Sequence, residues 1–138
     1  MSAYIISLDN AGDFESFRPP PQPIPAGGAP AALFDIQNPG RKGKLLATFN
    51  VGIGGELDTF YITRAAAPGG TQVKWKSGTD FLTPTSQQPE TINYFVPQPA
   101  GTSFQLLIDM TGVGDMRIWA GSNAGGSLSM EIGAATIT

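Results

Sequence analysis

The chain has 138 residues, the size of one ordinary domain. It holds 18 glycines and 12 prolines, together about 22% of the chain against roughly 12% in an average protein, and charged residues are only 14%. Because His and Cys are both absent, the chain alone cannot build a disulfide, a His- or Cys-ligated metal site, a Cys nucleophile or a Ser-His-Asp triad. The net charge of −3 lacks the basic surplus of a nucleic-acid-binding protein.

The first 31 residues are predicted to form a short strand, Ala3 to Leu8, followed by an extended arm. Six of the 12 prolines fall between residues 19 and 30, and proline neither donates a backbone hydrogen bond nor fits a sheet interior. We therefore expect a polyproline-like spacer. The N-terminus has no positive region and its apolar run is too short for a signal peptide, and no stretch approaches the roughly 20 apolar residues of a membrane span.

Residues 32–138 are predicted to form an all-β body. Alternating apolar residues and turn signals predict strands over residues 33–37, 44–51, 59–64, 71–76, 91–96, 103–110, 115–120 and 127–132, with 134–138 as a possible edge strand. We find no helical period free of glycine and proline. About eight or nine strands in this spacing predict an antiparallel β-sandwich of jelly-roll type, or a barrel.

Motifs for chemistry are scarce in this sequence. The glycine-rich stretch 52–57 lacks the last glycine and the following helix of a phosphate-binding loop, so we interpret it as a turn. Residues 38–44 fail the pattern of a P-loop. Near pairs of acids, at 56 with 58 and at 109 with 115, leave a glycosidase-like or calcium site chemically possible. We predict no catalytic, cofactor-binding or metal-binding residue and no cofactor.

A basic cluster and two tryptophans are the remaining candidates for binding. Arg41, Lys42 and Lys44 form either a solvated turn or a docking patch for an acidic partner. Trp75 shares its predicted strand face with an apolar residue, which indicates a core position. Trp119 falls out of phase with the apolar positions of strand 115–120, so it points away from the core, as a ligand platform or a subunit contact, unless a second layer buries it.

Aromatic residues in or before the arm suggest contacts with a neighbouring subunit. Tyr4, Phe14 and Phe17, with Pro20 between the prolines, have no core of their own in an extended segment. They can dock on a partner, or the arm can fold back and cover an edge of its own sandwich. If the arm only links the body to neighbours, removal of residues 1–31 leaves a folded body.

An extended segment, FESFRPPPQPIP at residues 14–25, joined to a compact β body low in charge resembles the small accessory proteins of tailed-bacteriophage virions, especially capsid decoration or cement proteins. The resemblance implies a non-enzymatic structural protein of the virion, made in the host cytoplasm without a signal peptide. It also implies a homo-oligomer, with a trimer favoured, bound to the major capsid protein or another virion protein and to neither nucleic acid nor membrane. A carbohydrate-binding β-sandwich module and a phage tail or fibre accessory protein are the alternatives.

Overall fold

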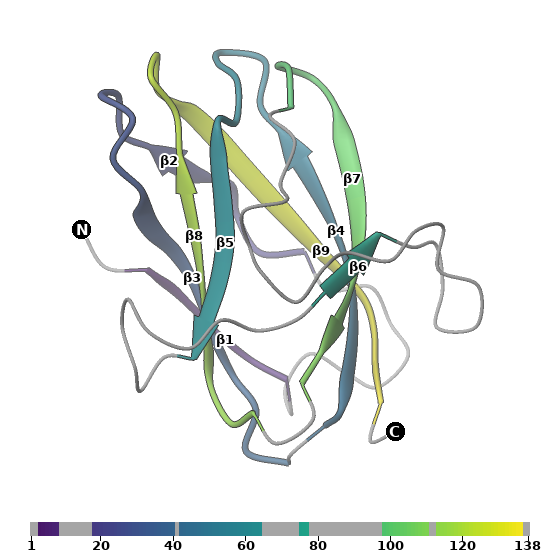
Figure 1. Cartoon of the computed structure of the whole chain (residues 1–138). Helices are drawn as coiled ribbons and strands as arrows, with labels where there is room; N and C mark the ends of the chain where they lie inside the picture. Colours follow the sequence, from purple (N-terminus) through teal and green to yellow (C-terminus); the bar gives the residue numbers. More distant parts are fainter. Residues whose placement is uncertain are drawn as a thin grey trace.

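Two β-sheets packed face to face make up the protein (Figure 1). The computed structural model describes residues 3–8, 18–40, 42–64, 75–77, 98–110 and 113–136, and the side chains of all these except 75–77 and 134–136. The described residues contain nine strands: β1 (Tyr4–Ser7), β2 (Gln22–Ile24), β3 (Ala31–Gln37), β4 (Lys44–Val51), β5 (Thr59–Arg64), β6 (Trp75–Ser77), β7 (Ser103–Asp109), β8 (Met116–Gly121) and β9 (Gly126–Thr136). The predicted all-β sandwich is confirmed.

The chain crosses repeatedly from one sheet to the other. One sheet has the order β1-β3-β8-β5 and the other the order β2-β9-β4-β7-β6. Successive strands in the chain lie in different sheets, except for β6 and β7, which are antiparallel neighbours in the same sheet. Pairing among the described strands is antiparallel except at one place, where β1 pairs with β3 in parallel. A parallel pair needs a crossover connection, and the chain through β2 in the opposite sheet provides it.

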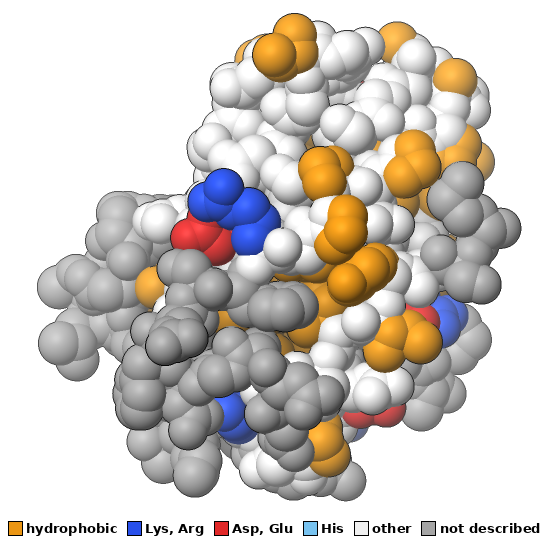
Figure 2. Space-filling view, turned by 180° about the vertical axis from the view of Figure 1, so that it is seen from behind, with side chains coloured by type: hydrophobic (Ala, Val, Ile, Leu, Met, Phe, Trp, Pro, Cys, Tyr) orange, Lys and Arg blue, Asp and Glu red, His pale blue; other side chains and the backbone are white. Residues whose placement is uncertain are grey.

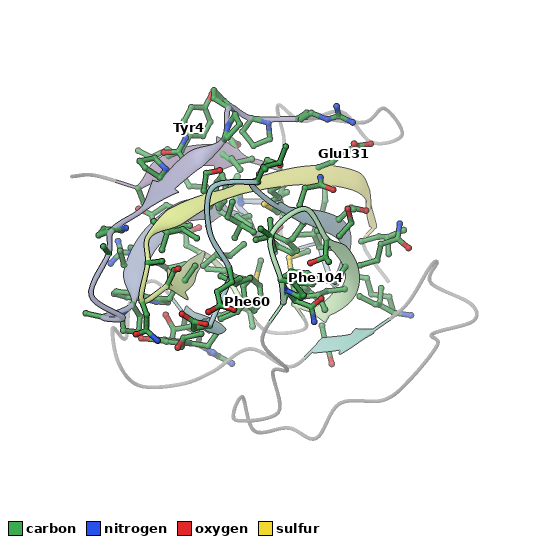
Figure 3. All side chains as sticks on the ribbon, turned by 90° about the horizontal axis from the view of Figure 1, so that it is seen from above. Tyr4, Phe60, Phe104 and Glu131 are labelled. Atoms are coloured by element: carbon green, nitrogen blue, oxygen red, sulfur yellow. The ribbon has the colours of Figure 1, made fainter. Side chains whose placement is uncertain are left out.

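Strict alternation along the strands fills the space between the sheets. In β4, every second side chain is buried and those between are half-buried, as the sequence pattern predicts. The centre of the core is aromatic: the ring of Phe49 lies 5.1 Å from Phe60 and 5.3 Å from Phe104, and Phe60 meets Phe104 edge-on at 5.4 Å. Figure 3 shows Phe60 and Phe104 close together between the sheets. Such contacts fix the spacing of the two layers.

The N-terminal segment is part of the sandwich rather than an appendage to it. Ile6 and Leu8 from the region of β1, and Ile24 from β2, all lie in the core, with at most 3% of their surface exposed. Described residues on both sides of position 31 therefore contribute to one core. Removing residues 1–31 would take away two strands and these core side chains, so we expect the remaining body to be less stable than the whole chain.

The proline arm lies along the outer edge of β9. At one end Arg18 pairs with Glu131 of β9, and at the other end Gln22–Ile24 pair with residues 126–128. Figure 3 shows Glu131 at the outer side of the β9 ribbon. The three residues Pro19–Pro21 lie between these two attachments and have no N–H group to offer. Proline at an open sheet edge offers no N–H group for pairing with a further strand. A segment that is unsuited to a sheet interior can therefore still join the sheet at its edge.

The C-terminal tail continues β9 instead of forming a separate edge strand. Residues 134–136 pair with residues 44–46 of β4 after a register shift between Leu46 and Ala47, so β9 lies inside its sheet between β2 and β4. The strand predicted at 71–76 overlaps β6, although residues 71–74 lie outside the described residues. The strand predicted at 91–96 lies outside them entirely.

Two neighbouring isoleucines of β1 test its place in the core. Ile6 is 1% exposed and Ile5 is 62% exposed. We expect Ile6→Ala to lower the free energy of unfolding by about 2–5 kcal/mol and Ile5→Ala to change it by less than about 0.5 kcal/mol, measured by urea denaturation. Equal effects of the two substitutions would show that β1 is not docked in the core.

Candidate functional site

Trp119 points away from the core, as its phase predicts. The side chains before and after it in β8, Ile118 and Ala120, are fully buried, whereas Trp119 is half-buried on the outer face of the sheet. Its Nε1 donates a hydrogen bond to Thr63 Oγ1 at 2.9 Å, and its ring stacks with Tyr61 at 5.8 Å between ring centres. The indole therefore connects β8 to β5 through both its polar and its aromatic groups.

An ion pair continues this row of contacts across the sheet. Arg117 Nε donates to Asp35 Oδ1 of β3 at 2.6 Å, and its guanidinium carbon lies 5.9 Å from the centre of the Trp119 ring. The hydrogen bond to Asp35 raises the pKa of the Arg117 guanidinium above its ordinary value. The outer row thus links β3, β8 and β5, and the Trp119 N–H and two nitrogens of Arg117 are hydrogen-bonded within the chain.

The predicted basic patch is not assembled by the described residues. Lys42 is only 9% exposed, and its backbone N–H and C=O are both bonded to the Asn38 side chain at 2.9 Å. Asn38 Nδ2 also donates to Val113 O at 3.2 Å, which joins two turns. Lys44 is half-buried, opposite Asp109 in the β4–β7 register. This arrangement fits the interpretation as a turn; Arg41 lies outside the described residues.

Only some of the remaining residues predicted to contact a partner lie within the part of the chain that the structure describes. Tyr4 is half-buried and packs against the core, so its ring is engaged within its own chain, while Pro20 is exposed beside β9. Trp75 begins β6 opposite Ile108, but its side chain is not among those described. Phe14 and Phe17 lie outside the described residues.

Two of the four acidic residues singled out in the sequence, Asp58 and Asp115, hold turns together. Asp58 Oδ2 accepts a hydrogen bond from Asn123 N at 2.7 Å, and Asp115 Oδ1 accepts one from Asn38 N at 3.2 Å. Within the part of the chain that the structure describes, no group of three or more His, Cys, Asp or Glu residues could hold a metal ion. These carboxylates act as caps on backbone N–H groups.

Four turns meet at one end of the sandwich and form a single surface. This surface, which we call the loop end, consists of residues 25–30, 52–58, 98–102 and 121–126, at the top of Figure 1. Backbone hydrogen bonds connect them: Gly27 and Gly28 donate to residues 123 and 122, Asp58 N donates to Gly121 O, and Leu57 exchanges two bonds with Gln98, all at 2.9–3.1 Å. The loop end is therefore a bonded unit rather than four separate loops.

Glycines allow the turns of the loop end to approach so closely. A Cβ atom at Gly55 would collide with the carbonyl oxygen of Gly125, and one at Gly121 would lie 2.9 Å from Gly28 O. Gly125 also has φ +81°, a conformation that side-chain-bearing residues rarely adopt. Backbone thus packs directly on backbone, which leaves little room for the turns to move independently.

Ile53 stands out from this glycine-packed surface. It is 91% exposed, the most exposed large hydrophobic side chain among the described residues, and it lies two residues before Gly55. The four turns contain no Lys or Arg; their acids are Glu56, which is exposed, and Asp58. Figure 2 shows a band of hydrophobic side chains down one face and further ones at the top, where no charged side chain is visible.

The sequence pattern did not predict the loop end. Residues 52–57 read as a turn, but strand periodicity assigns no role to Ile53, because it says nothing about a side chain outside a strand. One signal was available: a large aliphatic residue flanked by Gly52 and Gly54 has no neighbouring side chain to cover it.

The comparisons with known proteins identify no family for this chain. No protein-family model, no curated protein and no solved structure matches the chain. Among the described residues there is no helix long and apolar enough to span a membrane.

The packing of the loop end is tested by two adjacent glycines. Alanine at Gly55 must displace the turn that contains Gly125, whereas a Cβ atom at Gly54 meets nothing within 4 Å. We expect Gly55→Ala to destabilise the protein by about 1–3 kcal/mol and Gly54→Ala to leave it unchanged within about 0.5 kcal/mol, measured by urea denaturation. Indistinguishable stabilities would refute the close packing.

The indole hydrogen bond is tested at Thr63, which is 1% exposed. Thr63→Val removes the acceptor and leaves Trp119 Nε1 without this partner. We expect a loss of about 1–3 kcal/mol in the free energy of unfolding and a shift in tryptophan fluorescence. Thr63→Ser keeps the hydroxyl and should retain the wild-type emission maximum; if Thr63→Val also retains it, the hydrogen bond is absent in solution.

Proposed function

We propose that this protein is a non-enzymatic structural protein that binds other protein subunits, specifically a decoration or cement protein on the head of a tailed bacteriophage. The observation that carries the proposal is the loop end: a bonded, glycine-packed surface without Lys or Arg that presents the exposed Ile53. Two of the four acids considered for chemistry, Asp58 and Asp115, accept hydrogen bonds from backbone N–H groups in turns.

The loop end has the properties that favour tight contact with another protein. The centre of a protein interface is depleted of charged residues, and aliphatic or aromatic anchors there contribute most of the binding energy. A surface that is already ordered loses less conformational entropy on binding than mobile loops do. The hydrogen bonds among the four turns supply that order before any partner arrives.

The outer face of the second sheet supports self-association as part of the same proposal. Besides charged residues such as Lys44 and Glu131, it carries two pairs of neutral side chains that are hydrogen-bonded to each other: Gln105 Nε2 donates to Thr48 Oγ1 at 3.1 Å, and Ser103 Oγ bonds Asn50 Oδ1. Neutral, paired groups can be buried at a contact without the large cost of desolvating charges. A homotrimer on the virion, as proposed, would use such a face between its copies.

The experiment measures the mass of the protein in solution and its binding to capsid shells. We expect the purified protein to have the mass of a trimer by light scattering, and to sediment with empty shells assembled from the major capsid protein of the proposed phage. A protein that fails to sediment with these shells would contradict the proposal. Binding to tail tubes in place of shells would instead identify a tail accessory protein.

One observation favours the second candidate, a carbohydrate-binding module. The stacked pair of Trp119 and Tyr61 lies on an outer sheet face beside the Asp35–Arg117 ion pair, and sugars bind to aromatic rings next to polar groups. A glycan array is the test: specific binding that Trp119→Ala abolishes while Trp119→Phe retains part of it would establish the module, and an array without binding would remove it.

A further inference from the structure

Ile53 is positioned to enter a pocket rather than to lie flat on a surface. Its side chain is 91% exposed. A Cβ atom added at the neighbouring Gly54 would meet nothing within 4 Å, so the turn around Ile53 stands free of the surrounding chain. Burying an aliphatic side chain of this size is favourable by about 1.5–3 kcal/mol. A flat partner would cover only part of it, whereas a pocket for one aliphatic side chain would cover it all.

The base of the protruding turn is held in place. Val51 N donates to Thr102 O at 2.8 Å, and Val51 O accepts from Gly101 N at 3.0 Å. Gly52 N donates to Ser127 O at 2.9 Å. On the far side of Ile53, the backbone of Gly55 packs on Gly125. Both sides of the turn are thus anchored, so Ile53 keeps a defined position relative to the sandwich.

Charge narrows the chemistry of the partner. Glu56 is exposed three residues after Ile53, the nearby Asp58 caps Asn123, and the four turns hold no cation to neutralise them. A symmetric contact between two loop ends would place Glu56 near its own copy, and like charges facing each other oppose association. A partner of another kind, with Lys or Arg beside the pocket, fits the same surface without that repulsion.

We propose that Ile53 is the central anchor of this protein on its partner: it inserts into an apolar pocket of a different protein, and a Lys or Arg at the pocket rim faces Glu56. The inference rests on the proposed function, since the partner protein is then the capsid subunit. It adds the contact residues and the chemistry of the complementary surface.

The test compares Ile53→Ser with Ile5→Ser, the matched change at the other exposed isoleucine, in the co-sedimentation assay with capsid shells. We expect Ile53→Ser to weaken binding by at least about tenfold, as for an anchor at the centre of an interface, and Ile5→Ser to leave it unchanged. Thermal unfolding should be the same for Ile53→Ser and wild type, because the side chain makes few contacts in its own chain.

Glu56→Gln tests the charge at the rim. We expect it to slow association by about two- to fivefold at low salt and to reduce the salt dependence of binding, since a rim charge acts mainly on the encounter. An unchanged association rate at low salt would overturn the proposed cation opposite Glu56.

The outcomes separate the two proposals. If wild type binds shells and Ile53→Ser binds equally well, the inference is wrong and the proposed function stands. If wild type does not bind shells, the proposed function is wrong and the inference falls with it. If Ile53→Ser lowers the mass of the free protein by light scattering, the loop end contacts a second copy, which contradicts a different partner.

Discussion

Direct contact between backbones at the loop end is the constraint on which the rest of the structure depends. The turn at Gly55 packs on Gly125 without a side chain between them, and Gly121 approaches Gly28 in the same way. Each contact joins a turn between strands to one from elsewhere in the chain, so the strands leaving these turns enter their sheets at set positions. Because glycines at these contacts have no side chains, no large neighbouring side chain covers Ile53, and it protrudes from the surface.

Polar and aromatic side chains hold the sandwich together away from the loop end. Asn38 joins two turns at the opposite end, the Asp35–Arg117 pair links β3 to β8, and Trp119 links β8 to β5. A polar group committed to such a contact is unavailable for a substrate unless the contact breaks. Ile53, the most exposed large hydrophobic side chain among the described residues, lies at the loop end, and for this reason our proposal places the binding surface there.

Strand periodicity was sufficient to predict the body but not the surface. The bounds of β4 and β5 were predicted to the residue, because one buried face imposes strict alternation. The same phase argument placed Trp119 outside the core. β2 was missed, since Pro23 argues against a strand and only its position at an edge permits pairing. The parallel direction of β1 and the exposure of Ile53 depend on contacts between distant segments, which no local pattern records.

Hydrogen exchange of the free protein tests the central claim most directly. If the loop end is a bonded unit, the amides of Gly27, Gly28, Leu57, Asp58 and Gly101, each of which donates to another backbone carbonyl, should exchange as slowly as amides within β4 and β8. Exchange of these five amides at the rate of an unstructured chain, with the strands still protected, would show that the turns move independently and would contradict the account.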